Sequence, residues 1–445
     1  MYILKTNTVL IEDCKFKNAF SINSGGTFFF NNVMDVNANN IEVFNSTSIK
    51  NGSVIYIYTE QAVNNLVRFK NTKIYGVGTD DYKIDLGGFV ATVDGFSNLL
   101  ISNLYGEDIY CGNYGVGAFV VTNKSKIDIY NIELRNVHGS RYGGVLLNSY
   151  NEEEGSRFYV TNGTFIDFYQ HYEKPSATLL WSTDNIKVKL ENCNITNLYG
   201  NEEAVILYYD KNSDIVLKNV NIDGFYSVNG AFIRSGEPNG IAIQNVLLEN
   251  VTIQNSQCNK FIRLKFGAIT IKNSKFLNIS ENDNNLKIAD LDELTTLSIE
   301  NTEFDHIILK YGFETANNSE IHLINCTVNN SIFDKGFIST SNIINTTLTI
   351  KDSTFFNNTG NNGVIIHVDK LDEKTNVSFL DSTFKNNYAK RYGGVLYSRE
   401  KSIDTSITFN NCFFENNKAF LGNIINKIIQ ILSIIKNLNI YYKNI

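Results

Sequence analysis

Residues Val377 to Ser398, VSFLDSTFKNNYAKRYGGVLYS, contain the local pattern from which the fold can be predicted. The stretch begins with a short alternating strand, VSFL, and continues through an Asp-Ser-Thr-Phe corner and an Asn-rich turn. A glycine pair then precedes a second apolar strand, VLYS, and glycine supplies backbone freedom that residues with a Cβ lack. We interpret the stretch as one coil of a repeat.

The pattern recurs about every 28 residues, and its most regular feature is the corner, an Asn or Asp followed by a small residue and then a large apolar one. About fifteen corners are predicted. They are Asp13, Asn45, Asn71, Asn103, Asn131, Asn162, Asn192, Asn219, Asn250, Asn273, Asn301, Asn325, Asp352, Asp381 and Asn411. Glycine-led apolar runs such as GGTFFF and GGVLLN follow most corners. Short strands in so short a repeat predict a single-stranded parallel β-helix over residues 1–423, an elongated solenoid of stacked coils.

Composition excludes several classes of partner. The formal charge is −7 at pH 7, and no basic run is interleaved with aromatic residues, so we expect no nucleic acid partner. No stretch of about 20 apolar residues occurs, so no transmembrane span is expected. We also expect a monomer.

The two ends of the sequence depart from the repeat. Met1 opens directly on a strand pattern without a signal-peptide core, which fits either a cytosolic protein or a piece of a longer chain. We favour the longer chain because a solenoid normally begins with an atypical cap. Residues 424–445 lack the corner and glycine pattern, and two interpretations stay open: an amphipathic helix that caps the last coil, or translated non-coding sequence.

The last coils resemble a known repeat. Phe384 to Asn387, followed by Gly393-Gly394-Val395, is similar to the F-x-x-N and G-G-A-[ILV] motifs of chlamydial polymorphic outer membrane proteins. Phe355 to Asn358 and Phe414 to Asn417 match in part, and Val replaces Ala after the glycine pair. The rest of the chain resembles the pectin-lyase-like superfamily, which implies a right-handed parallel β-helix. The same hand follows from the rule for parallel crossovers.

The superfamily's enzymes act on pectin, and the resemblance implies where their residues would lie. An inverting hydrolase needs one carboxylic acid and one carboxylate arranged around a water. Only Asp80-Asp81 and the loose Arg263-Leu-Lys265 match the polygalacturonase motifs, and His138-Gly139 lies between them in the sequence. We therefore name no catalytic residue.

Two functions stay open. The first is a non-catalytic extracellular or cell-surface β-helix, adhesin-like or polysaccharide-binding. The alternative is a pectin-lyase-like polysaccharide lyase or glycoside hydrolase. An acid/base set on one face of adjacent coils would favour the enzyme.

Acidic residues gather in the turns that follow the glycine-led strands, among them Glu60, Asp94 and Asp210. If the coils stack in register, these turns form a solvated acidic edge that opposes lateral association. The longest turns are weak Ca²⁺ candidates because carboxylate oxygens are the ligands that Ca²⁺ prefers. The candidate ligands are Glu152, Glu153, Glu154, Asp369, Asp372 and Glu373. No other cofactor is expected.

Cysteines and histidines are expected to be structural. Cys14, Cys193, Cys326 and Cys412 each follow a corner residue, and they lie in coils too far apart for disulfides. Cys111 and Cys258 are expected to be free thiols. The five histidines, His138, His171, His306, His322 and His367, fall in five coils and are expected to pack or to form turns. The corner Asn residues are expected to stack into a ladder of side-chain amides.

Overall fold

The computed structural model shows an all-β chain that folds as a parallel β-solenoid. It describes residues 1–61, 65–78, 89–110, 117–139, 143–151, 154–171, 176–183, 185–201, 204–210, 212–236, 245–263, 267–281, 295–315, 317–340, 344–372, 374–399, 406–423, 425–427, 435–436 and 439–441. These residues contain no helix, and so none that could cross a membrane. Two compact units are distinguished: unit 1 is Met1–Gly230 with Ala242–Gln244, and unit 2 is Ala231–Ile241 with Asn245–Ile445.

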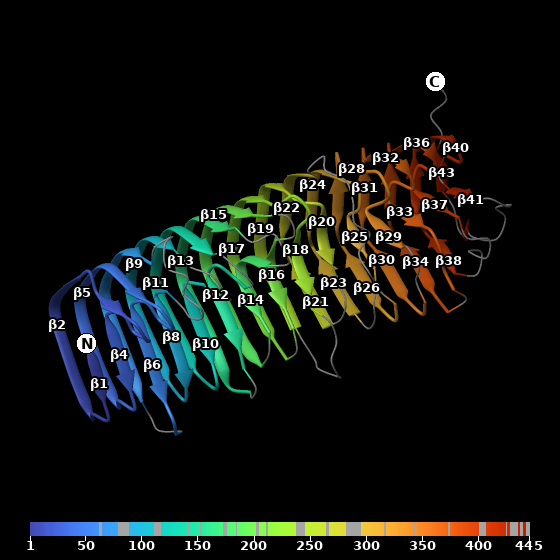
Figure 1. The fold of residues 1–445 in the computed structure, drawn as a ribbon. Coiled ribbons are helices and arrows are strands. Elements are labelled where there is room, and N and C mark those ends of the chain that lie inside the picture. Colours follow the sequence, from blue (N-terminus) through green and yellow to red (C-terminus); the bar gives the residue numbers. More distant parts are fainter. Residues whose placement is uncertain are drawn as a thin grey trace. The chain divides into compact units, whose positions relative to one another are not determined.

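Unit 1 consists of two sets of parallel strands that alternate along the chain (Figure 1). The short strands pair in the order β1 (Tyr2–Leu4), β4 (Phe28–Asn31), β6 (Ile55–Thr59), β8 (Ala91–Gly95), β10 (Phe119–Thr122), β12 (Leu147–Tyr150), β14 (Ser176–Ser182) and β16 (Ala204–Tyr209). The long strands are β2 (Thr8–Lys17), β5 (Asp35–Ser48), β7 (Leu66–Val77), β9 (Asn98–Tyr110), β11 (Lys126–Gly139), β13 (Ser156–Gln170), β15 (Ile186–Gly200) and β17 (Asp214–Tyr226), with β3 (Phe20–Ser21) beside β5. Each long strand pairs in register with its neighbours, as β11 does with β9 and β13.

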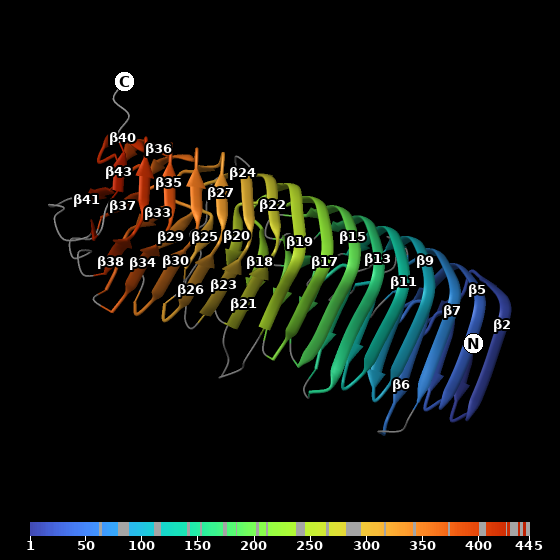
Figure 2. The same cartoon turned by 180° about the vertical axis from the view of Figure 1, so that it is seen from behind.

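Unit 2 repeats the arrangement with shorter pieces (Figure 2). Its short strands are β18 (Ala231–Ser235), β20 (Lys260–Arg263), β25 (Phe313–Glu314), β29 (Ile338–Thr340), β33 (Ile366–Val368), β37 (Leu396–Ser398) and β41 (Ile425–Lys427). Its other strands are β19 (Asn245–Gln257), β21 (Gly267–Lys272), β22 (Lys275–Ser280), β23 (Thr295–Glu300), β24 (Glu303–Leu309), β26 (Glu320–Ile324), β27 (Thr327–Asn329), β28 (Ile332–Phe333), β30 (Thr347–Lys351), β31 (Thr354–Phe356), β32 (Thr359–Asn362), β34 (Asn376–Leu380), β35 (Thr383–Lys385), β36 (Tyr388–Tyr392), β38 (Ile407–Asn410), β39 (Phe413–Glu415), β40 (Lys418–Leu421), β42 (Ile435–Lys436) and β43 (Asn439–Tyr441).

Every predicted corner residue has left-handed backbone, with φ between 49° at Asp381 and 62° at Asn162. Asn and Asp tolerate this conformation better than other residues with a Cβ. Within each unit these corners form a column, here called the first corner column, in which amides donate to the coil before them. Examples are Asn103 Nδ2 to Asn71 Oδ1 at 2.9 Å and Asn131 Nδ2 to Asn103 Oδ1 at 2.9 Å. Asn71 is an exception to corner-to-corner bonding, because its Nδ2 donates to Asn39 Oδ1 at 3.1 Å. The structure thus confirms the predicted ladder.

The corner predicted for the second coil is wrong by five residues. Asn40, rather than Asn45, stands in register with Asn71, because Asn39 pairs with Lys70 and Ile41 pairs with Thr72. Asn40 also has a positive φ of 57°, and its Nδ2 donates to Asp13 Oδ1 at 2.6 Å. In this coil both corners are Asn, and Asn45 rather than Asn40 is followed by a small residue, Ser46, as the predicted corner pattern requires.

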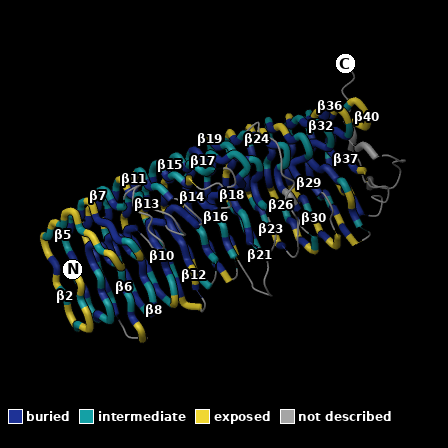
Figure 3. The backbone as a smooth tube through the Cα atoms, viewed as in Figure 1, coloured by how far each residue is buried: buried dark blue, intermediate teal, exposed yellow. Residues whose placement is uncertain are grey.

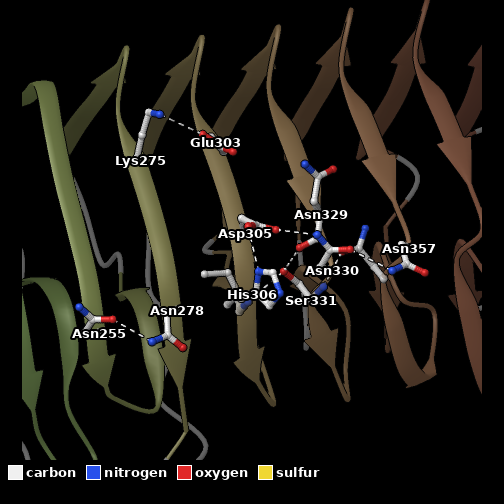
Figure 4. Close-up of polar contacts among 12 residues, drawn as sticks. Asn255, Lys275, Asn278, Glu303, Asp305, His306, Asn329, Asn330, Ser331 and Asn357 are labelled. Atoms are coloured by element: carbon white, nitrogen blue, oxygen red, sulfur yellow. Dashed lines mark hydrogen bonds and ion pairs between the residues drawn. The ribbon is translucent and has the colours of Figure 1, made fainter.

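A second corner column lies five residues after the first in every coil. Its members are Asn18, Asn45, Gly76, Asp108, Asn136, Asp167, Asn197, Gly224, Asn255, Asn278, His306, Asn330, Asn357, Asn386 and Asn416, all with positive φ. Figure 4 shows part of it in unit 2, where Asn278 Nδ2 donates to Asn255 Oδ1 at 2.8 Å. Where His306 occupies the column, the neighbouring Asp305 accepts the bond from Asn330 instead, at 2.9 Å.

The F-x-x-N motif has a direct structural meaning. Asn358, Asn387 and Asn417 follow the second corner and are buried, with relative exposures of 0, 0 and 4%. Asn387 Oδ1 accepts bonds from the backbone N–H and Nδ2 of Asn358 at 3.1 and 3.0 Å. Asn387 Nδ2 donates to the carbonyl of Phe355 at 3.0 Å and to Asn417 Oδ1 at 2.9 Å. The motif therefore places an internal amide ladder, since buried polar groups require partners.

Aromatic rings fill the interior next to this ladder. Phe355 and Phe384 stack with centroids 5.2 Å apart, and Phe384 and Phe414 stack at 5.0 Å. Along the long strands of unit 1, buried positions alternate with half-buried or exposed ones, as Figure 3 shows, whereas short strands such as β14 and β16 are buried at consecutive positions. The glycine pair closes the coil: Gly393 has φ +61°, and a Cβ there would collide with the carbonyl oxygen of Leu396. A residue with a side chain is therefore disfavoured at this turn.

Only part of residues 424–445 is described, and that part is not helical. The described residues of this segment are strands: β41 pairs with β37, β42 with β38, and β43 with β39. The reason is the unpaired edge of the preceding coil, which offers backbone donors and acceptors to any segment with strand-forming residues. Ile and Tyr have such propensity even without the corner pattern.

We expect Asn387→Ala to destabilise unit 2 strongly. The change leaves the buried N–H of Asn358 and the carbonyl of Phe355 without their amide partners, at about 1–3 kcal/mol each. The expected loss in the free energy of unfolding is therefore about 2–6 kcal/mol, measured by urea unfolding followed by circular dichroism. Asn386→Gly is the matched control, because glycine accepts its φ of 55°. Equal losses in the two variants would contradict the role of the internal ladder.

Candidate functional site

An open groove of about 460 Å³ lies on unit 1, along the first corner column. Strands β7, β9, β11 and β13 supply most of its lining. The lining residues are Asn40, Asn71, Thr72, Lys73, Asn103, Leu104, Tyr105, Asn131, Ile132, Glu133, Asn162 and Thr164. We call this feature the corner groove.

Strand register determines which side chains line the corner groove. Two residues after each corner, Lys73 pairs with Tyr105, Tyr105 with Glu133, and Glu133 with Thr164. The residues between them and the corner, such as Leu104 and Ile132, are buried. Because side chains of a strand alternate between two faces, this position points outward in every coil. The groove thus combines a column of corner amides with a column of varied polar side chains.

The corner amides retain hydrogen-bonding capacity toward solvent. A side-chain amide has two N–H donors and an oxygen with two acceptor sites. From Asn71 to Asn162 each amide donates once and accepts once, as Asn131 does with Asn103 and Asn162, at 2.9 and 3.0 Å. Asn103, Asn131 and Asn162 are exposed. One donor and one acceptor per coil are therefore available to a ligand, repeated at the strand spacing of about 4.8 Å.

Charges along the corner groove are paired except for one lysine. Lys15 Nζ lies 2.9 Å from Glu42, and this hydrogen bond and the lysine's charge hold the pKa of Glu42 below its usual range. Arg135 Nε lies 2.5 Å from Glu133 Oε1. Lys73 is exposed and makes no close ion pair or hydrogen bond within the described part of unit 1, and its charge adds to the lowering of the pKa of Glu42. Its ammonium group is the cation available to a ligand in the groove.

Tyr105 projects into the corner groove but is a poor proton acceptor. Its hydroxyl donates to Glu107 Oε2 at 2.8 Å, and this bond, with burial and the negative charge of Glu107, raises the pKa of Tyr105 to about 12. At neutral pH the phenol is therefore protonated. Tyr75 packs against the Tyr105 ring at 5.7 Å and against Phe44 at 4.9 Å. These contacts hold a rigid aromatic edge at the groove wall.

The arrangement is suited to binding rather than to proton transfer. A general base requires a pKa near the operating pH. The pKa of Tyr105 is raised to about 12, which is further from neutral pH than that of an ordinary tyrosine. Glu133 and Arg135 neutralise each other in an ion pair. What the groove offers is a repeated set of hydrogen-bonding groups, one free cation and an aromatic edge.

The calcium candidates are not brought together among the described residues. Glu152, Glu153 and Glu373 lie outside the described residues, and Glu154 is exposed. Asp369 Oδ1 lies 3.3 Å from both His367 Nε2 and Arg399, and the His367 hydrogen bond holds the pKa of Asp369 low. Within this part of the chain, no three His, Cys, Asp or Glu side chains group closely enough to hold a metal ion.

Asp372 is already engaged in its own turn. Its Oδ1 accepts bonds from the Thr375 hydroxyl at 2.6 Å and from the N–H of Asn345 at 3.0 Å. Burial alone would raise the pKa of Asp372, but these bonds and others from the backbone lower it. The carboxylate therefore stabilises the turn between neighbouring coils.

The acidic edge is in part structural. Asp94 Oδ1 accepts bonds from Thr122 at 2.8 Å and from Asn123 Nδ2 at 2.9 Å, which join two coils.

Of the residues compared with pectin hydrolases, Asp80, Asp81 and Lys265 lie outside the described residues. Arg263 is half-buried in β20, and His138 is near the end of β11.

The cysteines agree with the prediction where they are described. Cys14, Cys193, Cys258, Cys326 and Cys412 are free thiols. Burial raises the pKa of both Cys193 and Cys326 to about 11. These thiols are therefore protonated and unreactive at neutral pH. Cys111 lies outside the described residues.

The histidines divide into structural ones and a pair that the sequence did not reveal. His306 bonds Asp305 at 2.8 Å, His322 lies 3.9 Å from Glu320, and His367 is buried. His138 and His171, by contrast, lie against each other on adjacent coils. The only sign of this pair in the sequence is that His138 and His171 are about one coil length apart. That spacing can be recognised once the coils are aligned on the corner column.

Comparisons with known proteins leave the family unassigned. No protein-family model matches the chain, and no curated protein matches it. Among solved structures, the chain is similar to the PL6 family alginate lyase AlyGC, with 9% identity over 98% of this chain and 97% of that chain. The TM-score is 0.27, which is too low to carry an argument about activity. The fold assignment rests on the strand pairing described above.

We expect Glu107→Gln to lower the pKa of Tyr105 from about 12 toward its ordinary value of 10.0. The carboxylate favours the protonated phenol by accepting its hydrogen bond, and the neutral amide removes the charge. The measurement is the pH dependence of ¹³C-tyrosine ring resonances, with Tyr105→Phe to assign the signal. An unchanged titration midpoint in the variant would show that Glu107 is not the cause.

Proposed function

We propose that the protein is a non-catalytic β-helix that binds polysaccharide in the corner groove and acts outside the cell or at its surface, in an adhesin-like role. The observation that carries the proposal is the groove itself, in which exposed amides repeat once per coil beside Lys73, Tyr105 and Glu133. A repeating ligand matches a repeating row of donors and acceptors.

Polysaccharide is the ligand class that this chemistry favours. Sugar hydroxyls both donate and accept hydrogen bonds, as do the outward sides of the Asn103 and Asn131 amides. An open groove accommodates a chain that continues beyond it at either end. The free ammonium of Lys73 provides a partner for a sugar carboxylate, as charge-assisted hydrogen bonds are the stronger ones. Uronate-containing polysaccharides are therefore expected to bind better than neutral ones.

A second candidate function, a polysaccharide lyase or hydrolase, has one observation in its favour. Lys73, Tyr105, Glu107, Glu133 and Arg135 share one face of three adjacent coils, which is the kind of acid/base set that an enzyme of this fold would need. The pairing of Glu133 with Arg135 and the raised pKa of Tyr105 favour binding over catalysis. Product analysis separates the two functions.

We expect Lys73→Glu to weaken the binding of a uronate polysaccharide about tenfold, because it replaces an attractive charge by a repulsive one. Thr164→Trp should weaken binding without any change of charge, since the indole fills the end of the groove. Binding is measured by calorimetry and co-sedimentation with pectate, alginate and neutral glucans, with and without Ca²⁺. The calcium arm also tests the acidic turns as weak metal ligands.

Lys187→Glu is the matched control, because Lys187 is exposed on β15 and does not line the groove. Equal losses in Lys73→Glu and Lys187→Glu would mean that only net charge matters and would refute binding in the groove. The same mixtures are assayed for new reducing or unsaturated ends. Product formation by the wild-type protein would overturn the non-catalytic proposal in favour of the enzyme.

A further inference from the structure

A column of aromatic rings runs down unit 1, two residues after the second corner column. Tyr110, His138, Tyr169, Tyr199 and Tyr226 occupy it in successive coils and are half-buried. The His138 ring lies between Tyr110 and Tyr169, with centroids 4.5 and 4.6 Å away and the planes within 17°. The imidazole is therefore clamped on both faces.

Hydrogen bonds determine which nitrogen of His138 carries the proton. His138 Nε2 lies 2.8 Å from Asn136 Oδ1, an oxygen that can only accept, so Nε2 is the protonated nitrogen. Asn136 is oriented in turn, because its Nδ2 donates to Asp108 Oδ1 at 2.6 Å. In the neutral ring the lone pair consequently resides on Nδ1.

That lone pair points at a second imidazole. His138 Nδ1 lies 2.8 Å from His171 Nε2, and the two ring planes are within 12° of each other. His171 follows β13 and is exposed. Its backbone N–H donates to the carbonyl of Gly139 at 3.2 Å, and its carbonyl accepts a bond from Asn201 Nδ2 at 3.1 Å. The backbone is thus fixed and the side chain is accessible.

We propose that His138 and His171 form a binding site for a divalent transition-metal ion, with Cu²⁺ bound most tightly and Ni²⁺ and Zn²⁺ less so. Imidazole nitrogen is a preferred ligand of all three ions, and Cu²⁺ has the highest affinity of the series for such sites. The proposal is independent of polysaccharide binding in the corner groove.

The distance between the two nitrogens suits one shared ion. Two nitrogens bound at about 2.0–2.1 Å lie ~2.9 Å apart when the angle at the metal is a right angle, and ~3.4 Å apart when it is tetrahedral. The observed 2.8 Å is close to the right-angled value, which square-planar Cu²⁺ and Ni²⁺ adopt. The exposed His171 ring must turn to aim its lone pair at the ion, and its proton moves to Nδ1.

The surroundings of His138 resemble those of a metal ligand. Histidines that bind metals usually donate their second N–H to an oxygen acceptor, which fixes the tautomer and the ring orientation. Asn136 and Asp108 perform this role here. The two imidazoles provide two ligands, and water completes the coordination. This agrees with the finding that the described residues contain no group of three metal-binding side chains.

The test uses protein without a histidine tag. Calorimetry with CuCl₂ is expected to show one ion bound per chain, and electron paramagnetic resonance is expected to show hyperfine coupling to two nitrogens. His138→Phe keeps a ring between Tyr110 and Tyr169, and His171→Gln removes the exposed ligand. Each variant is expected to lose Cu²⁺ affinity by at least about tenfold and to lose one nitrogen from the spectrum.

His322→Gln is the control, because His322 lies in unit 2 and should not affect binding. Circular dichroism confirms that each variant is folded. Absence of one-to-one binding by the wild-type protein would overturn the proposal. A two-nitrogen spectrum that persists in His171→Gln would overturn it as well, because the ion would then be held elsewhere.

Discussion

The left-handed backbone conformation at two positions per coil is the constraint on which the whole structure depends. The two corners are five residues apart in every coil, so the strand between them has the same two outward-facing positions each time. Asn is used at most of these corners because it tolerates positive φ and because its amide bonds to the coils before and after. One residue type thus bends the chain and joins neighbouring coils. The repeat of about 28 residues in the sequence reflects the recurrence of these corners in every coil.

Much of the fold could be predicted from single residues, and the missed features have physical causes. The first corner column was identifiable because Asn or Asp occupies every position. The second was not, because Gly76, Gly224 and His306 interrupt it, so the sequence did not show that Asn45 belongs to the second column and Asn40 to the first. The strands after Ile424 were missed because edge pairing outweighs local pattern. No spacing in one coil indicates the corner groove, since Lys73, Tyr105 and Glu133 meet only through stacking in register.

Stacking in register also explains how chemistry arises in such a fold. Each outward position becomes a column, and a substitution in one coil changes the neighbours of only two others. The groove and the histidine pair occupy different columns of the same strands, so they can vary separately. Their components lie one coil apart in sequence, which is why residues remote in the chain become direct contacts. Function in this architecture is therefore a property of columns rather than of motifs.

The direction of the amide bonds gives each corner column a polarity. Asn donates to the coil before it, whereas Asp can only accept and has nothing to give to the preceding coil. Asp13, Asp108, Asp167 and Asp381 each receive a bond from the Asn of the next coil. Each Asp therefore interrupts the ladder toward the preceding coil, and its negative charge faces the N–H of the Asn in the next coil. In this respect it resembles the acidic residue that stabilises the start of an α-helix. The columns are segmented electrostatically, even where the backbone is continuous.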